Sequence, residues 1–286
     1  EGSHGTATLS LIGGFQEGEM IGPAFGSTYI LAKTENTDSE TPVEEDNWVA
    51  ALEWADSIGV DVTSTSLGYL DYESPFTSYT WQDMDGNTAL ITRAGDLAVG
   101  RGIVVVNSAG NNYDDPTHNT LGAPADGDSI FAIGSVNSSG LRSSFSSVGP
   151  TFDGRIKPDF MAQGSNDYHA SSFGNSYSFG SGTSFSCPIA AGICALMLQK
   201  NPSLTPMEIR NVLRSTSSNT SSPNKLIGWG IINALSAMNL VTIPVELTLF
   251  NGNYDNGVVI LKWITATETN NFGFEVERRN DYSNYE

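Results

Sequence analysis

A serine that could do nucleophilic chemistry lies between a glycine-rich turn and an apolar helical pattern, in FGSGTSFSCPIAAG at residues 179–192. Two interpretations fit Ser184 equally well. It can be the N-cap of the following helix, because a serine hydroxyl accepts hydrogen bonds from free N–H groups at a helix start. It can also be a nucleophile held on a turn, ready to form a covalent acyl intermediate. Pro188 predicts that a helix begins close by, since proline is tolerated only around the first helical turn.

A nucleophilic serine needs a general base, and the chain has only three histidines to offer. His4 opens SHGTATLSLIGG, whose small residues predict a helix that would hold one imidazole rigidly at its start. His118 and His169 lie in polar, loop-like sequence and are interpreted as solvated loop histidines. The Gly-x-Ser-x-Gly elbow of the α/β-hydrolases is not matched, because Ser186 stands where the second glycine would be.

The elements that must position these residues alternate between strand and helix. Short apolar runs predict strands at 28–34, 60–68, 102–112 and 129–136. Helical patterns run from a cap at Asp46 to Gly59, and from a cap at Asn87 to Gly100. We expect a doubly wound α/β fold, with a mostly parallel sheet, helices on both faces, and functional loops at the strand carboxyl ends.

The pattern changes near residue 240. A helical stretch over 230–238 is followed, from Pro244 on, by alternating apolar and polar residues around an Asp-Asn-Gly turn at 255–257, which predicts antiparallel strands. We therefore divide the chain into a first domain at 1–240, a linker at 241–245 and a partial all-β segment at 246–286. That segment is too short for a β-sandwich of about 100 residues, so an incomplete sandwich-like domain is expected.

Charge and composition exclude some function classes. The formal net charge is −19 with 13 scattered basic residues, which argues against nucleic acid or an anionic membrane surface as partner. No apolar run approaches the roughly 20 residues of a membrane span. The acidic stretch at 35–46 is interpreted as a solvated surface loop. Cys187 and Cys194 fall on one predicted helix, about 10 Å apart and beyond disulfide reach, so both are expected to be reduced core residues.

Three segments together resemble the motifs of the subtilisin-like serine proteases, the subtilases. Residues 182–192 closely resemble the serine motif, Ser3-His4-Gly5-Thr6 the histidine motif, and 104–111 the oxyanion segment, in the family's order. Further matches at 66–68, 145–164 and 228–238 extend the resemblance over residues 3–240.

This resemblance implies a secreted serine endopeptidase and gives the candidate residues their roles. Ser184 would be the nucleophile, and His4 the general base that later protonates the leaving amine. Asn111 would donate its side-chain amide to the oxyanion, together with the Ser184 backbone N–H. For Asn111 the residues alone leave a turn role open.

The resemblance also marks two segments that flank a substrate cleft. They are Ser66, Leu67 and Gly68, and Ser108, Ala109 and Gly110. An extended peptide or protein substrate would pair with them as an added strand.

One departure from the family bears on activity. Subtilases carry a catalytic aspartate upstream of the histidine, and this chain begins three residues before His4. Without that carboxylate the imidazole has no orienting group, a loss of about 10⁴-fold in subtilisin itself, so the fragment is expected to be a poor enzyme. Two alternatives stay open: an inactive subtilase fold that binds peptides or surfaces, and a transpeptidase or macrocyclase that excludes water from the same triad.

The sequence also bears on metal binding and on export from the cell. The loop at 83–87 hints at a calcium site, but it lacks the later bidentate glutamate of an EF-hand and has a simpler role before a helix. The resemblance implies that structural Ca²⁺ is possible, at residues we do not name, while the chemistry requires no cofactor. The tail from Pro244 resembles β-rich segments that precede C-terminal sorting domains in secreted bacterial proteins, which favours export.

Overall fold

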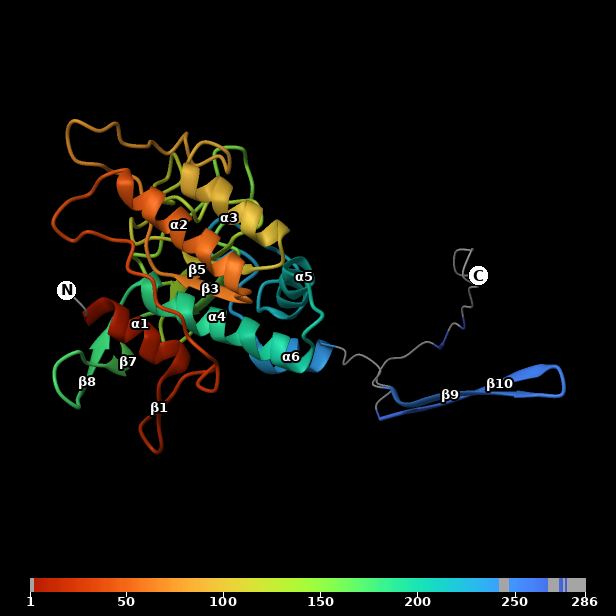
Figure 1. The fold of residues 1–286 in the computed structure, drawn as a ribbon. Coiled ribbons are helices and arrows are strands. Elements are labelled where there is room, and N and C mark those ends of the chain that lie inside the picture. The colour runs from red at the N-terminus through yellow and green to blue at the C-terminus, as the bar shows by residue number, and fades with distance from the viewer. Residues whose placement is uncertain (1–2, 242–246, 267–272, 275, 277–286) are drawn as a thin grey trace. The chain divides into compact units, whose positions relative to one another are not determined.

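The computed structural model describes residues 3–241, 247–266, 273–274 and 276. The chain divides into two compact units, Glu1–Leu240 and Val241–Glu286, and each is considered by itself (Figure 1). All but the first residue of the linker predicted at 241–245 lie outside the described residues.

The first unit is built on a four-stranded sheet. Its strands are β3 (Val62–Thr65), β4 (Val104–Ser108), β5 (Phe131–Val136) and β6 (Phe160–Gln163). They lie side by side in that order and all neighbouring pairs are parallel. The middle strands β4 and β5 are buried along their whole length, as their continuous apolar runs predict.

Helices cover both faces of this sheet, which confirms the predicted fold class. On one face lie α2 (Val43–Ile58) and α3 (Leu90–Gly100), and Trp48, Ile91 and Val105 share their core cluster. On the other face α4 (Thr183–Lys200) contacts all four strands (Figure 1). The helices α1 (Ser3–Gly13) and α6 (Ala234–Leu240) pack against α4, and α5 (Pro206–Thr216) packs against α6.

Two small hairpins complete the first unit. β1 (Phe15–Gln16) pairs with β2 (Met20–Ile21), and β7 (Asp167–Ala170) pairs with β8 (Tyr177–Gly180), both antiparallel. β8 leads directly into the turn before α4, so this second hairpin lies beside Ser184 along the chain.

The strand predicted at 28–34 does not form. Ile30 and Leu31 are exposed, and the sheet ends at β3, which pairs only with β4 among the described strands. An apolar run becomes a strand only where a neighbouring strand supplies hydrogen bonds and a buried face.

Both predicted helix caps on the α2 and α3 face are wrong. α2 begins at Val43 instead of after Asp46, and the Glu44 carboxylate accepts the N–H groups of Asn36 and Thr41 just before it. α3 begins at Leu90, and Asn87 belongs to a preceding turn instead of capping the helix. The predicted end of α2 is confirmed, since Gly59 adopts the left-handed conformation that glycine favours.

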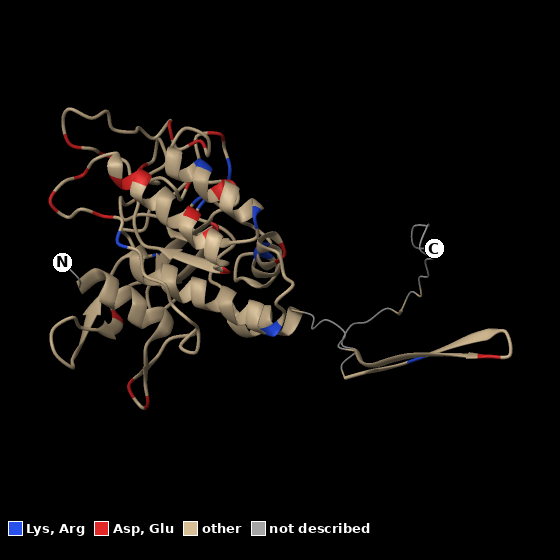
Figure 2. Cartoon of the chain, in the orientation of Figure 1, with Lys and Arg blue, Asp and Glu red and all other residues tan. Residues whose placement is uncertain are grey.

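The acidic stretch at 35–46 is only partly a solvated loop. Acidic residues gather at the start of α2 and in the loops around it (Figure 2). Glu44 and Glu45 are nevertheless buried, at 1% and 3% exposure. Glu45 accepts hydrogen bonds from the hydroxyls of Tyr72 and Tyr79 and from the N–H of Ile91, which offsets the cost of burying its charge.

The second unit contains one described hairpin, β9 (Leu247–Asp255) with β10 (Val258–Thr265). The strands are antiparallel and meet at a two-residue turn, in which Asn256 and Gly257 both have positive φ. This confirms the strands and the turn predicted from Asp-Asn-Gly. The helix predicted at 230–238 begins only at Ala234, as α6.

Candidate active site

Ser184 lies in the first turn of α4, directly after Thr183 and the capping residue Gly182. The side chain is half-buried, and its backbone N–H has no hydrogen-bond partner among the described residues. The first N–H groups of a helix have no partner within the helix and carry the positive end of its dipole. The Ser184 N–H is therefore a free donor beside its own hydroxyl.

Asn111 is fixed by Thr183. Its Oδ1 accepts the Thr183 N–H at 2.9 Å and the Thr183 hydroxyl at 3.1 Å. The same hydroxyl oxygen accepts the N–H of Gly110 at 3.2 Å. Both donors fix the oxygen end of the amide. The Asn111 Nδ2 group has no hydrogen-bond partner among the described residues, so it can donate to a ligand.

The segments predicted to flank a cleft follow adjacent parallel strands. Ser66, Leu67 and Gly68 continue from the end of β3, while Ser108 ends β4 and is followed by Ala109 and Gly110. Gly110 has φ 108°, and a Cβ there would come within 2.7 Å of Ser147 Oγ, so only glycine fits. The backbone N–H and C=O of Gly68 make no hydrogen bond within the described part of the chain.

His4 lies in the first turn of α1, as the sequence predicts. Ala7 and Leu11 of this helix pack with Phe185 and Ile189 of α4, so α1 lies against the helix that carries Ser184. The imidazole and the Ser184 hydroxyl are not hydrogen-bonded in this structure, nor does any described carboxylate contact His4. His4 is exposed at the protein surface, and the partial loss of its hydration there lowers the pKa of the ring below its ordinary value of 6.5.

The other two histidines differ from each other. His118 lies in a loop as predicted, stacked on Trp81 and 3.5 Å from Asp115 Oδ2. The loop prediction for His169 is wrong, because this residue belongs to β7 and its ring lies 5.2 Å from that of Phe185. The aromatic residues of the hairpin give this strand a packed face that its polar local sequence did not indicate.

The carboxylates of the loop at 83–87 accept hydrogen bonds from groups of the loop and its flanking residues. Asp83 accepts the N–H and hydroxyl of Thr80, and Asp85 accepts the N–H groups of Asn87 and Thr88. Within the described residues no group of three or more His, Cys, Asp or Glu side chains is arranged to hold a metal.

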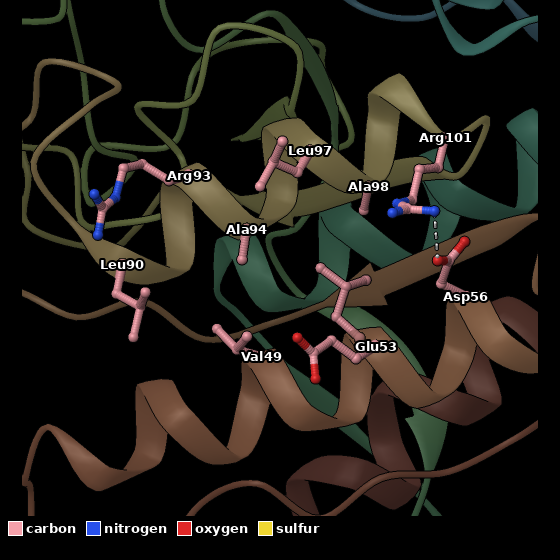
Figure 3. Close-up of a pocket in the computed structure, with 10 residues that line it drawn as sticks. Val49, Glu53, Asp56, Leu90, Arg93, Ala94, Leu97, Ala98 and Arg101 are labelled. Carbon is pink, nitrogen blue, oxygen red and sulfur yellow. Dashed lines mark ion pairs between the residues drawn. The ribbon is translucent and has the colours of Figure 1, made fainter.

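A groove elsewhere in the first unit is separate from these residues. It runs between α2 and α3, with Val49, Leu90 and Leu97 among its apolar lining and an ion pair of Asp56 with Arg101 at one end (Figure 3). No residue that the sequence nominates for catalysis lines it.

Sequence reasoning missed Thr183 and Ser147. Thr183 holds Asn111, and the Ser147 N–H donates to the carbonyl of Gly110 while its hydroxyl accepts the N–H of Asn112. Thr183 could have been suspected from its place beside Ser184, whereas the signal for Ser147 was only its place in the stretch at 145–164 that resembles the subtilases.

Comparisons with known proteins identify the family of this chain. A family model described as "Subtilase family" matches residues 1–230. Subtilisin DY of Bacillus licheniformis is 38% identical over 189 residues, which is 66% of this chain and 61% of that protein. Subtilisin NAT of Bacillus subtilis subsp. natto is 34% identical over 238 residues, which is 82% of this chain and 55% of that protein. The chain thus spans about three-fifths of the length of these relatives.

Solved structures share the fold. The patellamide maturation protease PatA aligns with a TM-score of 0.68 at 24% identity, covering 83% of each chain. MycP1 without its N-terminal propeptide aligns at 0.66 and 21% identity, covering 85% of this chain and 80% of that one. With the family model spanning most of the first unit and relatives above 30% identity, the chain belongs to the subtilase family.

Proposed function

We propose that this chain carries the catalytic residues of a serine endopeptidase. In the proposed reaction the Ser184 oxygen attacks a peptide carbonyl while His4 takes the hydroxyl proton, and the same proton then goes to the leaving amine. Water, deprotonated by His4, next attacks the acyl-serine. The bond to Ser184 Oγ breaks, His4 returns the proton to that oxygen, and the new C-terminal carboxyl group is released. These steps call for no cofactor.

The observation that carries the proposal is the orientation of Asn111. Two hydrogen bonds from Thr183 hold its oxygen, so its N–H groups are the part left to interact with a substrate. The free N–H of Ser184 provides a second donor at the start of α4. Paired donors that are fixed before the substrate arrives are what stabilises a tetrahedral oxyanion.

His4 is proposed as the base because it stands in the histidine motif of the subtilases and belongs to α1, a helix that packs against α4. A neutral imidazole is required for this role, and its lowered pKa favours the neutral form at pH 7. By analogy with the subtilases, we propose that the carboxylate that orients it comes from sequence N-terminal to Glu1.

An extended peptide is the proposed substrate. The unpaired N–H and C=O of Gly68 can pair with the backbone of such a peptide as an added strand, next to Ser66 and Leu67 on one side and Ser108, Ala109 and Gly110 on the other. The net charge of −19 does not favour polyanionic partners.

We also propose that the protein acts outside the cell, in keeping with the resemblance of the segment after Pro244 to those of exported bacterial proteins. No described helix is both long and apolar enough to cross a membrane. Mass spectrometry of the culture medium and of washed cells would test the proposal, and detection in the cells alone would contradict it.

Product masses test the proposed reaction. The full-length gene product is incubated with a mixed peptide library, with Ser184→Ala as control. Hydrolysis predicts pairs of fragments whose masses sum to one substrate plus one water, and these must vanish in the control. Ligated or cyclic products without added water would instead indicate transpeptidation, and an unchanged library with folded protein would indicate a binding module.

A further inference from the structure

The helix that carries Ser184 has a gap in its hydrogen bonding. In an α-helix the carbonyl of residue 184 accepts the N–H of residue 188. Residue 188 is Pro188, which lies inside α4 and has no N–H to give. The carbonyl oxygen of Ser184 therefore lacks its normal helical donor.

Ser66 supplies a donor from outside the helix. Its hydroxyl donates to the Ser184 carbonyl at 2.9 Å, across 118 residues of sequence. In return, Ser184 Oγ lies 3.4 Å from the Ser66 carbonyl oxygen, a long and weak contact. The residue proposed as nucleophile is thus bound through its backbone to the end of β3.

Neighbouring contacts hold the next turn of α4 separately. The buried Cys187 thiol lies 3.3 Å from the carbonyl of Thr65 and 3.5 Å from that of Val106. Ser64 contacts the same sulfur at 3.7 Å. These contacts fix the helix against β3 and β4. Among the side chains that the structure describes, the Ser66 hydroxyl is the one that bonds to the Ser184 backbone.

Ser66 also begins the segment 66–68, along which we propose that a peptide pairs. One residue therefore joins the peptide-binding backbone to the backbone of the nucleophile. A shift of either partner would change the distance between the bound carbonyl and Ser184 Oγ, and small misplacements of reacting groups are costly.

We propose that Ser66 is a positioning residue, whose hydroxyl replaces the helical N–H lost at Pro188 and sets Ser184 relative to the bound peptide. This inference rests on the proposed function. The Ser66 hydroxyl could instead contact the substrate directly. In that case the effect of removing it would not depend on which residue occupies position 188.

A double-mutant cycle tests this dependence in the full-length gene product. Ser66→Ala removes the donor, and Pro188→Ala restores an N–H to the helix. The rate of covalent labelling by a fluorophosphonate is measured for both single variants, the double variant and the wild type. With Pro188 in place, Ser66→Ala should slow labelling about five- to tenfold, the equivalent of one net hydrogen bond. In the Pro188→Ala background the same change should cost less than about twofold, because the new N–H satisfies the carbonyl.

Conservative and control variants separate positioning from general damage. Ser66→Thr keeps a hydroxyl and should recover most of the labelling rate. Ser64→Ala, two residues earlier on β3, should change the rate less than about twofold, since its contact with Cys187 is weak. With peptide substrates, Ser66→Ala should lower kcat more than it raises KM, because the peptide pairs with backbone groups that the variant retains.

The outcomes separate the positioning role of Ser66 from the proposed function on which it rests. Suppose that the wild type is labelled and that Ser66→Ala slows labelling equally in both backgrounds, or does not slow it at all. Either result overturns the positioning role and leaves the proposed function standing. A folded wild type that takes no label overturns the proposed function, and this inference falls with it.

Discussion

Thr183 donates two hydrogen bonds to one oxygen of Asn111, from its N–H at 2.9 Å and from its hydroxyl at 3.1 Å. The two residues are 72 positions apart in the sequence, and the fold joins the start of α4 to the end of β4 through them. The amide nitrogen of Asn111 has no hydrogen-bond partner among the described residues, and the residue is exposed. The predictions below follow from this arrangement and from the groups around it.

Replacing Asn111 by Leu should remove one oxyanion donor while keeping the size of the side chain. We expect kcat on a peptide substrate to fall about 100- to 1000-fold with KM little changed, a magnitude that comes from such a donor in subtilisin itself. Steady-state kinetics measure this. A fall confined to KM would mean that Asn111 only binds the ground state.

Thr183→Val should loosen Asn111 without removing it. The valine lacks the hydroxyl that accepts from Gly110 and donates to Asn111, but it keeps the backbone N–H. Losing about 1 kcal/mol from the hydrogen bonding that orients the Asn111 side chain would lower kcat by about fivefold. Thr183→Ser keeps the hydroxyl and should retain most of the rate. Equal activity of the valine and serine variants would show that the hydroxyl does not matter.

His4 should titrate below 6.5 in the 286-residue chain, because desolvation disfavours the charged ring. NMR of the ring protons measures this pKa, and a value of 6.5 or more would contradict it. The unfolded chain binds this proton more readily, so the contribution of His4 to folding stability is lost as the pH falls below about 6.5.

Both cysteines should resist modification in the folded protein. Cys187 and Cys194 are free and buried on α4, and burial raises the pKa of their thiols to about 11 and about 12. At pH 8 the reactive thiolate is therefore scarce as well as inaccessible. Ellman's reagent should detect neither thiol before unfolding and both after it, whereas rapid reaction of the native protein would contradict this burial.

Glu45 should contribute strongly to stability. Its carboxylate accepts from Tyr72 at 2.5 Å, from Tyr79 at 2.8 Å and from the N–H of Ile91 at 3.0 Å. Glu45→Ala leaves these donors without their acceptor and should lower the free energy of unfolding by about 3 kcal/mol. Urea denaturation measures the change, with the exposed neighbour Asp46→Ala as control, and similar small effects of both variants would contradict the account.

Local sequence was sufficient for part of this structure. The buried run at 104–108 and the turn at 255–257 were predictable, because continuous burial and positive φ restrict the residues that fit. The starts of α2 and α3 were not, since neither N-cap residue makes a side-chain hydrogen bond and the acceptor of the Ile91 N–H in α3 is Glu45, 46 positions earlier in α2. The run at 28–34 looked like a strand but has no described partner, and pairing depends on tertiary context.

The candidate site, too, could be predicted only in part from local sequence. Ser184, His4 and Asn111 stood out through their motifs, and the structure shows the helices and strand ends that hold them. The roles of Thr183 and of the Ser66 hydroxyl depend on contacts across 72 and 118 residues, which only the folded chain brings together. Pro188 gave a partial signal, since a proline inside a helix leaves one carbonyl in need of another donor.

Covalent labelling of Ser184 tests the central claim most directly. The full-length gene product is treated with a fluorophosphonate and examined by intact mass, beside Ser184→Ala and with circular dichroism as a check on folding. The account predicts a single adduct on the wild type that is absent from Ser184→Ala and forms much more slowly in Asn111→Leu. A folded wild type without an adduct, or an adduct that persists in Ser184→Ala, would contradict it.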